Sequence, residues 1–439
     1  MAKSTYSHAF LVGSFNGEIT HEQLDSQVWS REQISADGQM PRYSGDKGYN
    51  GLCTIYYKAH LDAMIEGENV KRPDFLNSVH HYIHCFSQED SNGEKLEKKV
   101  TLSLRKGRYP KLKDFDYTFK LCNLHLFFFP LDIVLFAIEI DDSETDLDDL
   151  TAAHNFLMSF WDTDSFHCEE LVQAMKPLTD KIIKSHNKKL TKDGNKLKLF
   201  QTIKLDIDTI QEDLLYELGT SCPIGCVNNG VRPDLKPSAE YFKQIICNNV
   251  VSTFDNWKGL ALVDSFTMLG KQDSFKEDDC NFMYFPLVYL RCLFEKTFCF
   301  SRNIAYREDN VDGRLSWEIE QMERYYFYDN ISYNFQPNVL YRAISKGLGI
   351  KEEREELTKQ VKEREEKRFD KILAYVAIFA VFSVVWDLCS IFMKASPAQR
   401  NSGTAIFFIV VGIIVACSFV VQIKYRQNGG KKFFGRDFF

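Results

Sequence analysis

The sequence predicts an α/β cytosolic domain with a helical layer, followed by a long stalk helix and a C-terminal two-helix transmembrane hairpin. Three observations lead to this fold class. Two long apolar segments, Ile372–Met393 and Ala405–Ile423, lie near the C-terminus. A highly charged segment without glycine or proline runs directly into the first of them. The preceding part of the chain alternates short apolar runs with turn residues and amphipathic patterns.

Composition limits the class of protein. The chain has 439 residues with a formal net charge of −7, so bulk electrostatics argue against nucleic acid as a partner, and no direct nucleic-acid binding is expected. The N-terminal residues lack the apolar core and cleavage pattern of a signal peptide, which predicts that the bulk of the chain stays in the cytosol. Twelve cysteines without a regular framework are typical of a reducing compartment.

The two apolar segments are predicted to cross a membrane. At 1.5 Å per residue each is roughly 28–33 Å long, which matches a hydrocarbon core of about 30 Å. The outer loop at 395–404 is short and contains Pro397 and Gly403, so the pair should form a tight hairpin. Basic residues flank the hairpin before the first span and in the tail at 424–439, whereas the loop region has only Lys394 and Arg400. The positive-inside rule therefore predicts a multi-pass protein of the inner membrane with both termini cytoplasmic.

A third apolar segment, Cys122–Ile140, is long enough to compete as a span. Pro130 and Asp132 lie at its middle, and β-branched and aromatic residues surround them. Two buried strands, Leu124–Phe129 and Ile133–Ile140, joined at Pro-Leu-Asp explain this composition better than a membrane helix.

The cytosolic part is predicted in two sections. Residues 1–146 are expected to be strand-rich, with short apolar runs at 8–15, 52–57, 78–86 and 99–104. Residues 147–349 are expected to be mainly helical. Helices are predicted at 147–161 and at 286–300, the second with Pro286 in its first turn and an Arg291–Glu295 pair four residues apart.

The charged segment at 350–371 is predicted to continue without a break into the first transmembrane helix at 372–394. Neither glycine nor proline occurs between Ile350 and Lys394, so the simplest structure is one helix of about 45 residues, roughly 67 Å long. Two interpretations of the charged segment remain: a solvated spacer, or a stalk that transmits movement from the cytosolic domain to the membrane.

Polar and small residues follow one face of the first span. At 100° per residue, the positions within an arc of about 80° are Ala380, Ser383, Asp387, Ser390 and Lys394. This set is called the polar stripe below. Continued toward the cytosol, the same face reaches Val376 and Leu373.

Asp387 has two chemical interpretations. A lone carboxylate that faces lipid costs at least ~2.5–3.5 kcal/mol, so its side chain should face protein or water. It could hydrogen-bond to a neighbouring helix, or the polar stripe could line a pore at the axis of a homo-oligomer. In the pore, Asp387 would hold a cation transiently, and Leu373 and Val376 would form a hydrophobic gate. We favour the pore, because five positions are in register.

The layout resembles the CorA-type divalent cation transporters. The resemblance is specific for 350–439, where EREEKRFDKILAYVAIFAVF enters the membrane and KYRQNGGKK leaves it. It implies a pore-lining first span and Mg²⁺ as a permeant ion. The Gly-Met-Asn triplet that follows the first span in that family is absent from SIFMKASPAQRNSG, which argues against constitutive Mg²⁺ uptake. In size and sequence character the chain is similar to the CorA-like subgroup associated with type III CRISPR systems. That likeness implies an antiviral effector gated by a nucleotide second messenger, the conjugate of S-adenosylmethionine and AMP.

Other patterns offer candidate sites. The basic run Arg105, Lys106, Arg108 and Lys111 could contact a phosphate-bearing ligand, although such runs are more often solvated loops. The acidic run Glu139–Asp149 could hold a divalent ion or could leave a strand and cap the next helix.

Further residues could bind a transition metal. His80 with His84, and His81 with Cys85, would share a face only on a helix, whereas their segment is more typical of a strand. Cys222 and Cys226 have no second pair at zinc spacing. No catalytic constellation or nucleotide-binding glycine pattern is found, so the chain is not expected to be an enzyme.

Overall fold

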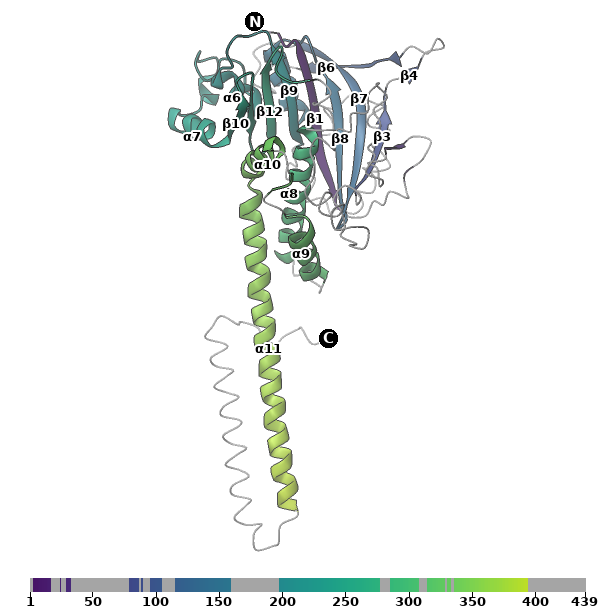
Figure 1. The fold of residues 1–439 in the computed structure, drawn as a ribbon, viewed down its shortest axis with the longest axis vertical. Helices are drawn as coiled ribbons and strands as arrows, with labels where there is room; N and C mark the ends of the chain where they lie inside the picture. The colour runs from purple at the N-terminus through teal and green to yellow at the C-terminus, as the bar shows by residue number, and fades with distance from the viewer. Residues whose placement is uncertain are drawn as a thin grey trace. The chain divides into compact units, whose positions relative to one another are not determined.

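The structure is a computed structural model. It describes residues 3–16, 24, 29–32, 79–86, 88–89, 95–104, 115–158, 197–276, 285–307, 314–327, 330–332 and 335–393. The chain divides into two compact units, Met1–Thr358 and Lys359–Phe439, and each is described by itself (Figure 1).

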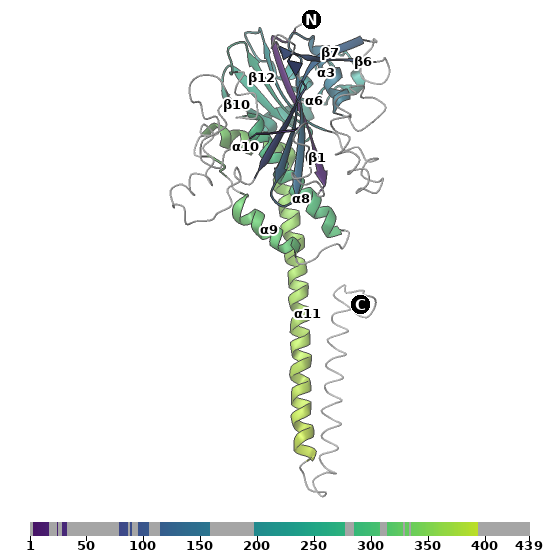
Figure 2. The ribbon, with the colours of Figure 1, turned by 90° about the vertical axis from the view of Figure 1, so that its right-hand side faces the viewer.

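A ten-stranded mixed sheet forms the centre of the first unit, and its twist is visible in Figure 2. The strand order is β10-β11-β12-β9-β1-β8-β7-β3-β2, and β6 also pairs with β7. All pairs are antiparallel except β9 with β12. The strands are β1 (Tyr6–Asn16), β2 (Ser30–Glu32), β3 (His80–Cys85), β6 (Lys98–Leu104), β7 (Phe115–Phe129), β8 (Ile133–Asp141), β9 (Lys198–Leu205), β10 (Val250–Phe254), β11 (Trp257–Ala261) and β12 (Ser265–Lys271); β4 (Gln88–Glu89) and β5 (Lys95–Leu96) form a separate pair.

Helices cover both faces of the sheet. The described helices are α3 (Leu147–Leu157), α6 (Glu212–Thr220), α7 (Ala239–Asn249), α8 (Phe285–Arg307), α9 (Arg314–Tyr325), α10 (Phe335–Leu348) and α11 (Ile350–Met393), with a short 3₁₀ helix at Pro233–Leu235.

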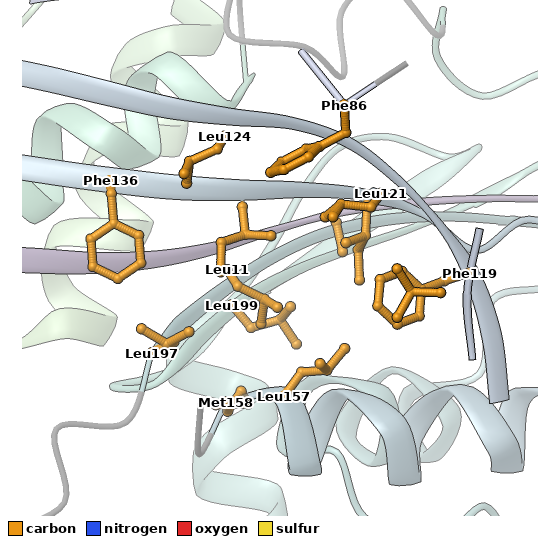
Figure 3. Packing of buried hydrophobic residues seen from close by; sticks show 14 of the residues in the cluster. Leu11, Phe86, Phe119, Leu121, Leu124, Phe136, Leu157, Met158, Leu197 and Leu199 are labelled. Carbon is orange, nitrogen blue, oxygen red and sulfur yellow. The ribbon is translucent and has the colours of Figure 1, made fainter. Parts of the chain in front are cut away.

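Successive side chains of each strand point to opposite faces of the sheet, so each face packs against different helices. Leu11 and Leu199 point toward α3, where Leu157 and Met158 complete an apolar core (Figure 3). On the opposite face Phe200 packs against Tyr289 of α8, with ring centroids 5.5 Å apart. The sheet is therefore the middle layer of three.

The apolar segment at 122–140 forms the end of β7, a tight turn and β8. Phe129 pairs with Ile133, and Leu131 and Asp132 both have left-handed φ angles, 60° and 59°. The prediction of two buried strands is confirmed, although β7 begins earlier than predicted, at Phe115.

The section at 147–349 differs from the prediction. The helices predicted near 147 and 286 are present as α3 and α8, but four strands, β9 to β12, also lie in this section. They belong to the same sheet as β1, so residues on both sides of the predicted boundary at 146/147 contribute to one sheet. Strand β9 was missed because it buries polar Gln201 and Thr202 and therefore lacks an apolar alternation. The run at 52–57 lies outside the described residues.

A buried polar network explains how β9 tolerates these residues. His154 of α3 donates from Nε2 to Asp142 Oδ2 over 2.7 Å, and its Nδ1 lies 2.9 Å from Gln201 Oε1. The Gln201 amide nitrogen donates to Leu218 and Thr267, which leaves Oε1 as the acceptor for His154. His154 therefore links Asp142, directly after β8, to Gln201 of β9 through its two ring nitrogens.

The phenol of Tyr117 completes this network by donating to Asp142 Oδ2. Burial alone would raise the pKa of Asp142, but the charge and hydrogen bond of His154 outweigh burial and lower the pKa below its ordinary value. Among the described residues, by contrast, the buried hydroxyl of Tyr289 has no hydrogen-bond partner.

These two tyrosines make a matched pair for stability. We expect Tyr117→Phe to lower the free energy of unfolding by about 1–3 kcal/mol, because it leaves a buried carboxylate short of a donor. Tyr289→Phe should leave stability unchanged or raise it, because it removes an unpaired buried hydroxyl. Guanidinium unfolding of the two variants provides the measurement; equal losses would contradict the assigned network.

Candidate functional site

The first turns of α11 are anchored in the first unit. Helix α10 ends at Leu348, and Gly349 has a φ of 66°, which terminates α10 and lets a new helix begin at Ile350. Ile350 and Leu357 are both buried. We call 350–358 the stalk base.

Ion pairs surround these buried positions. The Arg354 guanidinium forms a two-point contact with the Glu323 carboxylate of α9, and its Nε lies 3.0 Å from Oε1. The same guanidinium lies 4.3 Å from the ring centroid of Phe327. Lys296 of α8 pairs with Glu353 over 2.5 Å. The stalk base is therefore bound to two different helices by charged groups.

A second charged group lies beneath the stalk base, between α8 and α10. Glu295 is fully buried, lies 3.1 Å from the Arg291 guanidinium and accepts a hydrogen bond of 2.8 Å from the Tyr341 hydroxyl. The predicted Arg291–Glu295 pair is thus confirmed. Burial raises the pKa of Glu295 to about 6, and Arg291 opposes this rise without cancelling it.

The described part of the second unit contains the N-terminal part of the predicted pore face. Leu373 and Val376 are 51% and 59% exposed, and Ala380 and Ser383 are exposed as well. Asp387 and Ser390 are helical positions of α11, but their side chains lie outside the described part of the structure, as does Lys394. Leu373, Val376, Ala380 and Ser383 thus lie along one unbroken helix.

Phe369 belongs to the same face and was missed by the sequence analysis. It precedes position 387 by 18 residues (387 − 369), which is five turns at 3.6 residues per turn. Its ring is 62% exposed although Arg368 and Asp370 flank it in a charged segment. The sequence does contain a pattern that indicates this position, because Phe369 is an isolated aromatic residue in helical register with the apolar face farther along α11.

Among the described residues, no helix is both long and apolar enough to cross a membrane. The second predicted span at 405–423, the outer loop at 395–404 and the tail at 424–439 all lie outside them. The transmembrane hairpin therefore stays a prediction.

A row of titratable side chains crosses four strands of the sheet. Glu139 of β8 accepts from Nε2 of His8 and Nε2 of His125, both over 2.9 Å, and His125 Nδ1 lies 3.0 Å from His81 Nε2. Burial alone would raise the pKa of Glu139, but the histidine hydrogen bonds lower the pKa far below its usual range. Burial lowers the pKa of His81 well below the ordinary value, which favours the neutral form of this ring.

These contacts do not form a metal centre. In the described ranges, no three histidine, cysteine, aspartate or glutamate side chains are arranged to hold a metal ion. The segment with His80, His84 and Cys85 forms strand β3, which confirms the strand interpretation of that run.

Cys226 belongs to the second group of candidate metal ligands. Burial raises the pKa of the Cys226 thiol to about 12, which keeps this thiol protonated.

The acidic run after β8 has separate structural roles. Asp146 is the N-cap of α3 and accepts from the Asp148 backbone amide over 3.0 Å, and Asp148 in turn accepts from the Ile224 amide. The helix-cap interpretation of this run is confirmed. The candidate ligand contacts Arg105, Lys106, Arg108 and Lys111 lie in a segment that the structure does not describe.

Comparisons with known proteins give no relative: no family model, no curated protein and no solved structure matches the chain.

The raised pKa of Glu295 predicts a pH dependence of stability. A carboxyl group whose pKa is higher in the folded state contributes stability below the unfolded value of 4.5 and loses it as pH rises through about 6. Between pH 4.5 and 7 the wild type should therefore lose about 2 kcal/mol more unfolding free energy than Glu295→Gln, which cannot titrate. Guanidinium unfolding of both chains at the two pH values measures the difference. Parallel pH profiles would contradict the raised pKa.

Proposed function

We propose that this chain is a homo-oligomeric, CorA-like membrane cation channel, gated by a nucleotide second messenger of the S-adenosylmethionine–AMP type, and that it acts as a type III CRISPR antiviral effector. The observation that carries the proposal is α11, a single helix from Ile350 to Met393 whose outer part presents exposed Leu373, Val376, Ala380 and Ser383 on one face.

An uninterrupted helix supports a pore better than a tether. A tether needs only apolar side chains, whereas the sequence from 380 to 394 adds small and polar residues at helical spacing. One hairpin cannot enclose a water path, so several copies of the first span surround the axis in the proposed channel. Asp387 and the two serines then replace part of the hydration shell of a cation such as Mg²⁺.

The gate in this proposal is apolar. Rings of Leu373 and Val376 side chains exclude water from a narrow constriction and stop ions without blocking the path sterically. Phe369 adds a third ring five helical turns from the level of Asp387. A nucleotide opens the gate only if it binds the open state more tightly than the closed state.

The signal is received by the first unit, which lies in the cytosol in this proposal. The chain carries no expected catalytic site, so the nucleotide acts as a ligand and not as a substrate. Its contacts are unassigned, and the basic run at Arg105, Lys106, Arg108 and Lys111 stays the sequence-based candidate. The inner membrane with both termini cytoplasmic is the proposed location.

Two alternatives make different predictions. A constitutive Mg²⁺ transporter would conduct without nucleotide and would be inhibited by hexammine cobalt, but the missing Gly-Met-Asn triplet disfavours it. A membrane-anchored nucleotide sensor or enzyme would bind nucleotide and conduct no ions.

Flux through liposomes tests the proposed conduit. The full chain is reconstituted with a Mg²⁺-sensitive dye inside, and the S-adenosylmethionine–AMP conjugate is added outside. We expect nucleotide-dependent flux that falls at least about tenfold in Asp387→Ala, because the cation site is lost, and in Ser383→Trp, because the path is filled. Ile378→Trp, on the opposite face of α11, is the matched control and should conduct normally. Flux that is unaltered by the first two changes would exclude the polar stripe as the conduit.

Phe369 supplies a separate test of the gate. Removing its ring in Phe369→Ala should raise leak flux without nucleotide at least about tenfold, because a shorter apolar constriction is wetted more easily. Phe382→Ala removes the same side chain, 71% exposed in this structure, from another face of the helix and should not leak. Equal leaks in the two variants would show that bulk apolar area, and not a gate, determines closure.

A further inference from the structure

The tip of the β7–β8 hairpin is held by a side chain from α8. Arg302 donates from Nη2 to the Leu131 carbonyl oxygen over 2.9 Å. Leu131 is in the left-handed region, which is unusual for a residue with a branched side chain, so the direction of this carbonyl depends on the turn keeping its shape. Arg302 therefore contacts a backbone group that moves whenever the turn changes.

The same guanidinium also contacts α9. Arg302 Nε lies 2.6 Å from Glu318 Oε2, and the guanidinium lies 5.3 Å from the Phe298 ring centroid. Glu318 is almost fully buried, and the Arg302 cation compensates its carboxylate. A planar guanidinium can bind two elements at fixed angles, which a lysine cannot do.

Helix α9 carries the contact on to α11. Glu318 and Glu323 belong to the same helix, which is fixed by buried Ile319 and Met322. Glu323 makes the two-point contact with Arg354 of the stalk base. The sheet and the first turns of α11 are thus joined through two arginine–glutamate pairs and one rigid helix.

We propose that this hairpin-to-stalk chain, Leu131–Arg302–Glu318 and Glu323–Arg354, couples the sheet to the stalk and that Arg302 is its positioning residue. The inference rests on the proposed function, because it assigns the route by which a signal in the cytosolic unit reaches the gate. Lys296 pairs with Glu353 and joins α8 directly to the stalk base, so this contact does not pass through α9. The chain through α9 is the part that senses the turn.

The first test separates nucleotide binding from gating. Glu323→Arg and Arg354→Glu should each lower nucleotide-dependent Mg²⁺ flux at least about tenfold while calorimetric affinity for the S-adenosylmethionine–AMP conjugate stays within about twofold. The double charge swap rebuilds the pair and should restore flux to within about threefold of the wild type. Both side chains are about one-third exposed, which favours folding of the variants. Normal flux in the single variants, or no rescue in the double swap, would overturn the coupling. If the wild type itself shows no nucleotide-dependent flux, the proposed function is overturned instead.

The second test needs neither nucleotide nor flux. In the full chain, Arg302→Met should speed amide hydrogen exchange of the stalk base at 350–358 at least about tenfold, and Arg302→Lys should restore only part of the protection. The matched control is Arg232→Met, which breaks an exposed two-point pair with Asp234 and should leave the stalk base unchanged. Unchanged exchange in Arg302→Met would overturn the coupling whatever the channel does.

Discussion

One constraint underlies the functional argument: α11 contains no residue that could break it between Ile350 and Met393. Gly349, with its left-handed φ, is the last interruption before that helix. Because a continuous helix advances by a fixed angle per residue, the face occupied by Phe369 determines the face occupied by every later position. A glycine or proline between Phe369 and Ser383 would weaken or interrupt the helix, and these positions would then not share one face.

Charge compensation shapes two regions of the first unit. The Asp142–His154 pair is fully buried between α3 and the sheet, where Tyr117 donates a further hydrogen bond to Asp142 and the side-chain oxygen of Gln201 accepts one from His154. At the stalk base the ion pairs are only partly buried. Breaking a partly exposed ion pair lowers the free energy of unfolding less than breaking a buried, hydrogen-bonded pair. The fully buried pair thus lies in the core, while the partly exposed pairs lie where α11 begins.

Features that depend on interactions between residues close in the sequence could be predicted, whereas features that depend on contacts between distant segments could not. The long helix, the two strands around Pro130 and the strand at His80–Cys85 depend on local periodicity and turn residues, and the sequence predicts each of them. Strand β9 does not show such a pattern, because its buried polar residues are compensated by α3, α6 and β12. No local sequence pattern indicates the contacts of Arg302 with residues 131 and 318. The same holds for the contact of Arg354 with residue 323, since each of these contacts joins separate helices or a helix and a turn. Phe369 is intermediate, because its signal is local but becomes visible only when the stripe is extended toward the N-terminus of α11.

The exposure of Phe369 bears on the two interpretations of the charged segment. A solvated spacer gains nothing from a large apolar ring among lysines, arginines and acidic residues, because exposing that ring to water is unfavourable at about 25 cal/mol per Å². A helix that meets copies of itself around an axis buries the ring at that axis while the flanking charges stay solvated outside. The face that would then be buried is the one on which Leu373, Val376 and Ala380 lie. Leu373 precedes Val376 by three positions and Val376 precedes Ala380 by four, which are the spacings that α-helices use for packing seams. An assembly in which copies of α11 meet around a common symmetry axis therefore gives Phe369 a role, whereas a solvated spacer does not.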